Sequence, residues 1–264
     1  MSGAAPAEAQ APAPVDGPAG EGLLGRLLQL RQASILTSRY VDLKLADLGG
    51  LFFLLVQAPL IGWLIGVAYE GKTQSRTIDF ILVIVAVWFG CFNACREVVK
   101  ERLIFLRERR AGVTVRAFLV SKVLVLTVFA ALQCLVLLIM VARTVRMESS
   151  LPLLYVGLLT TCLTATALGL LLSSVVRSQN SLIALVPIAL IPQLIFSEVT
   201  LGTTSPLVKR IELGMIAAWG LDLLDALRRS KPAWGTIIQG EAVLVGMSLG
   251  LLLLAGVCLR AQDE

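Results

Sequence analysis

The chain contains no histidine. This absence excludes Ser-His-Asp and Cys-His nucleophile arrangements, metalloprotease helices and histidine proton relays on this chain. The pattern G-x-x-x-x-G-K-[ST] of phosphate-binding loops is matched only by residues 66–73, which end an apolar run and do not lie between a strand and a helix, so we expect no ATP hydrolysis by this chain. Five cysteines lie in or near apolar segments without histidine partners and are interpreted as small apolar fillers. We therefore predict no catalytic residue, no cofactor and no metal ligand.

Charge is scarce as well. Charged residues make up 16% of the sequence, against about 25% in soluble domains. Hydrophobic residues make up 57%, and the mean hydropathy is +0.85. These values indicate an integral membrane protein. The net charge of +5 comes without basic stripes interleaved with aromatic residues, so we expect no nucleic-acid partner.

The first 46 residues change character once. Residues 1–21 are rich in Ala, Pro and Gly and are predicted to form a disordered tail without the features of a signal peptide. Residues 22–46 place Leu and Ile at helical spacing with Arg26, Arg31 and Arg39 between them. This pattern predicts a basic amphipathic connecting helix in the cytoplasmic membrane interface.

Residues 47–264 are expected to form an all-α membrane domain. A helix needs about 20 apolar residues to cross a bilayer. Six apolar runs come close to this length or reach it, and we predict six transmembrane helices over residues 48–69, 80–95, 123–142, 151–176, 182–197 and 242–259. The fifth run is short and contains Pro187 and Pro192.

The distribution of Lys and Arg predicts the orientation, because these residues concentrate on the cytoplasmic side. Placing the N-terminus in the cytoplasm puts 14 of the 23 Lys and Arg residues on that side. Both termini are therefore expected to be cytoplasmic, in the inner membrane of a bacterium.

The segment 96–116 holds most of this charge, with seven Lys or Arg against three Glu. Such a block should not enter a bilayer. It could be a solvated loop, but Val98, Val99, Arg102, Phe105 and Leu106 recur at helical spacing. We therefore predict a short amphipathic helix at the membrane surface.

The segment 199–240 is long and only partly polar. Ser205 and Pro206 have the pattern of a helix start, and an apolar stripe follows from Leu207 to Leu227. We predict a re-entrant helical element on the outer side before the last transmembrane helix, with a break at Gly214 or Gly220.

Polar residues inside the apolar runs are few. Gln57, Asn93, Gln133 and Gln193 can line a path or form helix–helix hydrogen bonds, and the pattern does not separate these roles. Glu198 ends the fifth run and is expected at the interface. Two G-x-x-x-G pairs, Gly62 with Gly66 and Gly246 with Gly250, are interpreted as sites of close helix packing.

The order of these features resembles a known family. A basic amphipathic helix is followed by Gln57-Ala58-Pro59 in the first apolar run and by E-R-L-I-F-L-R-E-R-R-A-G-V after the second. This order is similar to the membrane domain of type-2 ABC exporters, particularly G-subfamily-like permeases. Residues 187–197 and 211–225 resemble the fifth helix and the outer re-entrant helices of that family.

The resemblance implies a transporter permease. ATP and Mg²⁺ would bind to a separate ATPase subunit, because the ATPase half often fused to such permeases is absent from these residues. A coupling helix within 96–116 would dock on that ATPase through eight residues: Glu97, Glu101, Arg102, Phe105, Arg107, Glu108, Arg109 and Arg110.

The resemblance also implies a second permease in the lipid bilayer, either a second copy of this chain in a homodimer or a related permease. The substrate path would run along the second and fifth helices at the dimer interface. Its candidate residues are Asn93, Gln133, Pro187, Pro192, Gln193 and Glu198. Two alternatives remain open: a membrane scaffold or sensor that does not transport, and an intramembrane enzyme using Glu198 or Ser248.

Overall fold

The computed structural model describes residues 23–176, 178–195, 206–229 and 233–261, and this part of the chain is helical, without a named strand. The 1–21 tail and Glu198 lie outside the described residues. The helices are α1 (Leu23–Ala46), α2 (Leu48–Ala68), α3 (Arg76–Ala94), α4 (Glu97–Arg110), α5 (Val115–Ala142), α6 (Leu151–Val175), α7 (Gln179–Ile195), α9 (Pro206–Glu212), α10 (Ile216–Arg228) and α11 (Trp234–Arg260).

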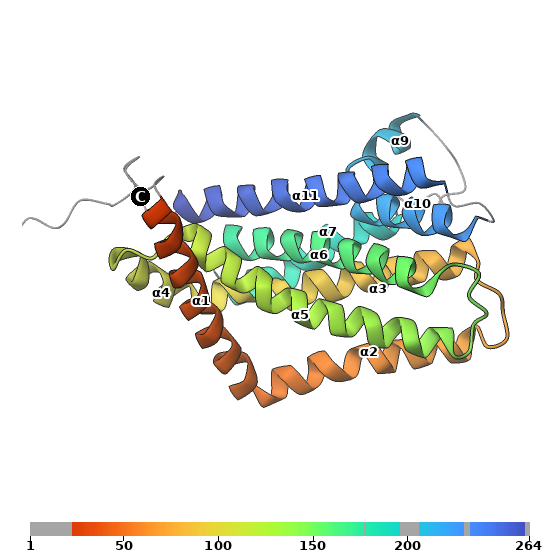
Figure 1. Ribbon diagram of the computed structural model, residues 1–264, viewed down its shortest axis with the longest axis horizontal. Helices are drawn as coiled ribbons and strands as arrows, with labels where there is room; N and C mark the ends of the chain where they lie inside the picture. Colours follow the sequence, from red (N-terminus) through yellow and green to blue (C-terminus); the bar gives the residue numbers. More distant parts are fainter. Residues whose placement is uncertain (1–22, 177, 196–205, 230–232, 262–264) are drawn as a thin grey trace, which may run out of the picture.

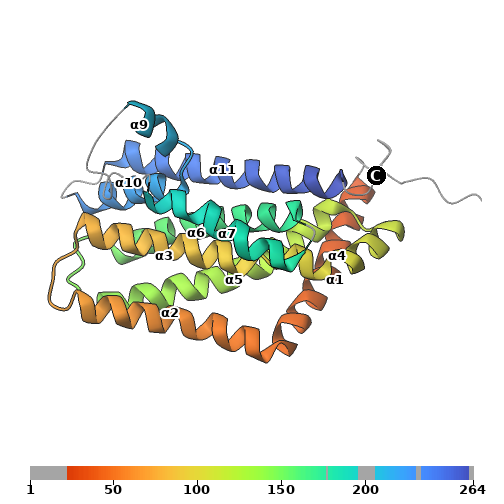
Figure 2. The same ribbon diagram turned by 180° about the vertical axis from the view of Figure 1, so that it is seen from behind.

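Five segments are long and apolar enough to cross a membrane: α2, α3 continuing into α4, α5, α6 and α11. They run along the long axis of the molecule, and α7 lies beside them (Figures 1 and 2). The predicted all-α multi-pass fold is thereby confirmed for five helices. The predicted fifth transmembrane helix corresponds to α7, which has 17 residues, contains Pro187 and Pro192, and is shorter than the other five. Its length is at the lower end of the range for spanning helices.

Small residues allow α3 and α6 to pack most closely. A Cβ added at Gly90 of α3 would lie 2.1 Å from the carbonyl oxygen of Cys162, and one at Gly169 of α6 would lie 2.6 Å from that of Cys91. The α3–α6 pair therefore forms the centre of the bundle. The sequence analysis did not single out these two glycines.

The two G-x-x-x-G pairs behave differently. A Cβ added at Gly62 would lie 2.8 Å from the Met140 Cβ, and one at Gly66 would lie 2.8 Å from the Thr144 hydroxyl oxygen. This confirms close packing of α2 on α5. At Gly246 and Gly250 of α11, no described atom lies within 4 Å of the added Cβ. Gly246 and Gly250 therefore make no close helix contact within the described part of this chain, because that face of α11 points away from the bundle. Their packing against another molecule stays a prediction.

At one end of the bundle, α1 crosses the other helices at a steep angle and lies beside α4 (Figure 1). Ala33 and Leu36 of α1 are buried together with Ala117 at the start of α5. The C-terminal end of α11 reaches the same end of the molecule. The helix predicted within 96–116 is α4. It follows α3 directly, and a turn at Cys95 and Arg96 joins the two helices.

At the opposite end, the chain forms α9 and α10 before α11. The break between them falls at Gly214, one of the two predicted positions. Gly220 instead packs inside the bundle, where an added Cβ would lie 2.9 Å from the Thr161 hydroxyl oxygen. The buried face of α10 contacts α3, α6 and α11. The last helix, α11, begins at Trp234, whereas the apolar run predicted a start at residue 242. Residues 234–240 of the 199–240 segment therefore belong to α11.

Candidate functional site

The first carboxylate of α4, Glu97, faces α1. It accepts a hydrogen bond from the Tyr40 hydroxyl, and the Lys44 ammonium pairs with it at 2.7 Å. Burial, and then the Glu97 charge, raise the pKa of Tyr40 above its ordinary value. The hydroxyl therefore stays protonated and remains a donor to Glu97 at physiological pH.

The second carboxylate, Glu101, lies between α1 and α5. It pairs with Lys122 of α5 and, at 3.6 Å, with Arg39 of α1. The Lys122 side chain is only 1% exposed, and its ammonium lies 3.5 Å from the centroid of the Tyr40 ring. Such a buried cation is stable only when it is paired. Here the Glu101 carboxylate and the face of the Tyr40 ring both stabilise the Lys122 ammonium.

Glu108 pairs with the same Arg39 near the end of α4. The chain then reverses at Gly112, whose φ of +95° favours glycine, and the Gln32 amide of α1 donates to the Gly112 carbonyl at 3.2 Å. We call the seven side chains that join α1, α4 and α5 the ionic cluster: Arg39, Tyr40, Lys44, Glu97, Glu101, Glu108 and Lys122.

Two further contacts fix α4. Phe105 is buried against Phe118 of α5, with ring centroids 4.4 Å apart. The Ser173 hydroxyl of α6 accepts the backbone N–H groups of Val98 and Val99, each at 3.1 Å, and so satisfies two donors in the first turn of α4. The helix is therefore joined to α1, α5 and α6.

The exposed face of α4 is the opposite one. Leu103 is 71% exposed and Ile104 is 45% exposed, and Arg107 and Arg110 lie beside them with exposed side chains. We call these four residues the α4 outer face. Leu103 and Ile104 form a small apolar patch bordered by arginines, which a partner or the membrane surface can cover. Leu103 and Ile104 were not among the predicted coupling residues, although each is an apolar residue within a charged helix.

The eight residues predicted to couple to an ATPase therefore fall into two groups, those covered by this chain and those exposed. Glu97, Glu101 and Phe105 are buried within the chain, and Arg102, Glu108 and Arg109 are half-buried. Arg102 donates to the Val176 carbonyl at the end of α6, at 3.5 Å. Only Arg107 and Arg110 of the eight are exposed.

Polar residues in the apolar helices form a chain across the bundle. The Gln57 amide of α2 donates to Asn93 of α3 at 3.3 Å, and Asn93 donates to Gln133 of α5. Gln133 returns a hydrogen bond to the Leu54 carbonyl at 2.8 Å and is buried. Gln133 thus forms helix–helix hydrogen bonds, while Gln57 and Asn93 also line a cavity.

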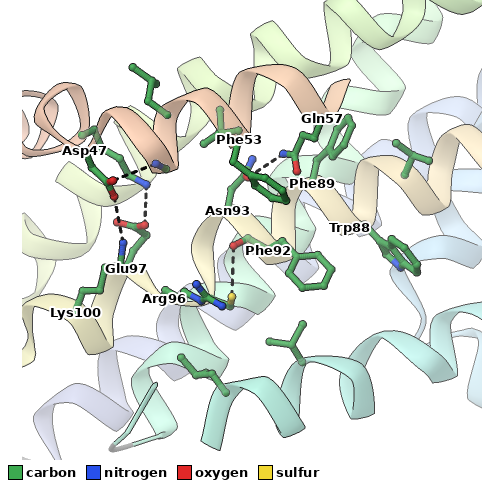
Figure 3. Close-up of a pocket in the computed structure, with 18 of the residues that line it drawn as sticks. Asp47, Phe53, Gln57, Trp88, Phe89, Phe92, Asn93, Arg96, Glu97 and Lys100 are labelled. Carbon is green, nitrogen blue, oxygen red and sulfur yellow. Dashed lines mark hydrogen bonds and ion pairs between the residues drawn. The ribbon is translucent and has the colours of Figure 1, made fainter. Parts of the chain in front are cut away.

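This cavity has a volume of about 610 Å³ and lies between α2, α3 and α7. Asp47, Glu97, Lys100 and Arg96 gather at one end, and Phe53, Trp88, Phe89 and Phe92 line the remainder (Figure 3). Pro187 of α7 contributes to the wall, as do Leu182 and Val186. The volume is typical of a ligand site.

The other two predicted path residues of α7, Pro192 and Gln193, are less exposed than Pro187. Pro192 is half-buried, and Gln193 is buried with its side-chain oxygen accepting the Ala217 N–H of α10 at 3.0 Å. Gln193 thus satisfies a backbone donor in the first turn of α10. Its role in the structure is to hold α10 against α7.

One charged group that the sequence analysis missed is Asp79 of α3, which is 0% exposed. It accepts hydrogen bonds from the Gln74 amide at 2.6 Å and from the Arg228 guanidinium of α10 at 3.2 Å. Arg228 also pairs with Asp225. A lone carboxylate at the start of an apolar run was the available signal. Within the described residues, no group of three acidic, Cys or His side chains is placed to hold a metal ion.

Five bilayer-length apolar helices and a charged helix fastened across one end define a polytopic membrane protein with a surface helix attached to its transmembrane bundle. Residues 31–205 match the family model described as ABC-2 type transporter. The chain belongs to this family, and it is accordingly a transmembrane permease of an ABC transporter. The matched region includes the ionic cluster and the α2, α3 and α7 residues of the cavity.

A search of curated proteins adds one relative. The chain is 28% identical over 234 residues to an ABC transporter ATP-binding/permease protein of Mycobacterium tuberculosis. The alignment covers 79% of this chain and 27% of the relative, so the chain spans about a quarter of that protein's length.

Proposed function

We propose that the chain is the permease of an ABC exporter driven by a separate ATPase subunit that docks on the α4 outer face. The observation that carries the proposal is the direction of the α4 side chains. Its carboxylates are engaged by Arg39, Lys44 and Lys122 of the same chain, whereas Leu103 and Ile104 are left exposed. An exposed apolar pair flanked by arginines suits a partner surface with an apolar pocket and an acidic rim.

The ATP chemistry belongs to the partner in this proposal. Residues 66–73 match the pattern G-x-x-x-x-G-K-T, but they run from the last turn of α2 into the turn after it, without the preceding strand and directly following helix of a phosphate-binding loop. ATP and Mg²⁺ would therefore be held elsewhere. The name of the mycobacterial relative describes it as both an ATP-binding protein and a permease. A separate ATPase subunit is therefore part of what we propose, and the docking face would serve a fused ATPase domain equally well.

The ionic cluster provides a route for force. When the ATPases close on ATP, a push on α4 would act on α1 through Arg39, on α5 through Lys122 and on α6 through Ser173. α4 also continues α3 after a single turn. Alternating access requires two states that ATP favours unequally. The joined helices α1, α4, α5 and α6 would move as one rigid body from one state to the other. Glu97, Glu101 and Phe105 would then transmit the movement rather than touch the ATPase.

We further propose a G-subfamily-like homodimer with six transmembrane helices, α7 being the fifth and α10 forming a re-entrant outer element. The cavity of α2, α3 and α7 would open on the substrate path at the dimer interface. The distribution of Lys and Arg, with α1, α4 and the end of α11 at one end of the bundle, supports cytoplasmic termini in a bacterial inner membrane.

The test is ATPase coupling. The double variant Leu103→Ala with Ile104→Ala, reconstituted with its ATPase, is expected to lose most of the transport-linked ATP hydrolysis while inserting in the membrane normally. Leu253→Ala is the matched control, because Leu253 is a similarly exposed leucine of α11, outside both the α4 outer face and the ionic cluster. Unchanged coupling in the double variant, or failure of the chain to co-purify with any P-loop ATPase in mild detergent, would refute the proposal. The second result would favour a scaffold that does not transport.

A further inference from the structure

The cavity between α2, α3 and α7 has a directional character. Its charged end lies where α1 meets α2 and where α3 meets α4, at the end of the bundle that carries the surface helices. From there the wall becomes aromatic along α3, through Phe92, Phe89 and Trp88 (Figure 3). Charged groups at the surface and apolar walls inside the membrane match the orientation of an amphiphile in one leaflet.

The charged end has an excess of one positive charge. Lys44 and Glu97 form a pair at 2.7 Å and offset each other. Asp47 stays ionised because its hydrogen bond from the Gly50 N–H, and then Lys100, lower its pKa. It therefore offsets Lys100, which lies 3.6 Å away. No carboxylate in the described parts of the chain pairs with Arg96, whose side chain is exposed.

Arg96 is also well placed. It lies at the junction of the charged end and the aromatic wall, between Lys100 and Phe92 (Figure 3). A guanidinium group binds phosphate or carboxylate oxygens in a bidentate manner. Beyond it, the Asn93 and Gln57 amides bond to each other at 3.3 Å and border the cavity. They offer polar contacts where the glycerol and ester groups of a lipid follow its head group.

We propose that this cavity binds an anionic amphiphile, with its acidic head group on Arg96 and its acyl chain along Phe92, Phe89 and Trp88. The volume of about 610 Å³ accommodates an acyl chain, and basic pockets between helices at the membrane surface are suited to acidic head groups. That this ligand is the cargo rests on the export function proposed above. Binding itself does not depend on an ATPase.

The binding experiment uses Trp88 as a reporter in the full chain carrying Trp63→Phe, Trp219→Phe and Trp234→Phe, the other tryptophans of the sequence. Lysophosphatidylglycerol with a brominated acyl chain is titrated at a fixed excess of nonionic detergent. We expect saturable quenching of Trp88. Brominated lysophosphatidylcholine keeps the phosphate but adds a choline cation, which would be repelled by the net positive charged end of the cavity, and is expected to bind about tenfold more weakly.

Arg96→Gln is expected to weaken lysophosphatidylglycerol binding about tenfold and to abolish the preference over lysophosphatidylcholine. Arg116→Gln is the matched control, because Arg116 is an exposed arginine at the same end of the bundle that does not line the cavity. Glycerol 3-phosphate is expected not to displace the lysolipid.

Three outcomes would overturn the assignment: equal affinity for both lysolipids, no effect of Arg96→Gln, or displacement by glycerol 3-phosphate, which would indicate a site for a free phosphate. The cargo role is tested separately by reconstitution with the ATPase. Lysophosphatidylglycerol is expected to stimulate ATP hydrolysis by the ATPase in complex with the parent chain and not in complex with the Arg96→Gln chain. Trp88 quenching without stimulation would reject the cargo role, whereas unchanged coupling in the Leu103→Ala and Ile104→Ala double variant would count against the export function alone.

Discussion

The ammonium group of Lys122 on α5 lies 3.5 Å from the centroid of the Tyr40 ring on α1, and the same ammonium pairs with Glu101 on α4. One side chain thus joins three helices at the end of the bundle. It does so from a position that is 1% exposed. An unpaired charge there would be very costly, so the three helices are constrained to stay together.

The first prediction concerns this pair. Lys122→Met removes the cation and leaves Glu101 buried with only Arg39 at 3.6 Å, so we expect a loss of about 3 kcal/mol in unfolding free energy. The double variant Lys122→Met with Glu101→Gln should lose less than Lys122→Met alone, because no buried charge remains unpaired. Thermal unfolding of the purified chain in detergent, analysed as a double-mutant cycle, measures the difference. Strictly additive losses would show that the two groups do not interact.

The second prediction separates the two roles of Tyr40. Tyr40→Phe keeps the ring against Lys122 but removes the hydroxyl that donates to Glu97. We expect a loss of about 1–3 kcal/mol, the range for a hydrogen bond to a charged group. Tyr40→Leu also removes the aromatic face and should cost more. If the phenylalanine and leucine variants unfold at the same temperature, the ring makes no contribution of its own.

Sequence reasoning located α4 because charge cannot enter a bilayer, and its apolar positions recur with helical period. It could not determine which way the carboxylates face. Glu101 and Glu108 meet Arg39, a residue on another helix, and hydrophobic periodicity contains no information about such long-range pairs. The exposed Leu103 and Ile104 were therefore overlooked in favour of the charged residues around them.

The ends of the membrane helices were missed for a related reason. The apolar run predicted from Phe80 leaves out Asp79, yet α3 begins at Arg76 and buries that carboxylate against Arg228. Likewise, α11 begins at Trp234 because a helix continues through an isolated Gln239 or Glu241. A hydropathy pattern ends a segment at a polar residue, whereas the folded chain can satisfy that residue with a distant partner.

The third prediction tests the centre of the bundle. Gly90→Ala places a methyl group 2.1 Å from the Cys162 carbonyl oxygen, which belongs to backbone and cannot move aside. We expect α3 and α6 to separate, at a cost of at least about 3 kcal/mol, the upper part of the range for overpacking. Gly246→Ala is the matched control, because no described atom lies within 4 Å of the new methyl group. Its stability should stay equal or rise by about 0.5–1 kcal/mol through helix propensity.

Size-exclusion chromatography and thermal unfolding in detergent measure both glycine variants. A Gly90→Ala chain as stable as the parent would contradict the close approach of α3 and α6. Destabilisation by Gly246→Ala equal to that of Gly90→Ala would instead indicate that the open face of α11 is packed against another molecule, such as a second copy of the chain.

The fourth prediction concerns the attachment of α10. Asp79 is the buried carboxylate that holds Arg228 of α10 to α3, and Gln193 of α7 holds the other end of α10 through the Ala217 N–H. Asp79→Ala breaks the first attachment and leaves the second. α10 should therefore detach from α3 more often at its Arg228 end, without loss of the rest of the fold.

The labelling rate of a cysteine placed at Leu224 measures this opening, because Leu224 lies on the buried face of α10. A Cys258→Ser background removes the native cysteine that is not buried. Asp79→Ala is expected to raise the maleimide labelling rate by at least about tenfold, since each 1.4 kcal/mol lost from the opening free energy is a factor of ten. Glu148→Gln serves as the control, because it removes an exposed carboxylate at the same end of the bundle without touching Arg228. Equal labelling rates in the Asp79→Ala and parent chains would mean that hydrophobic packing of α10, and not the Asp79–Arg228 pair, holds this helix in place.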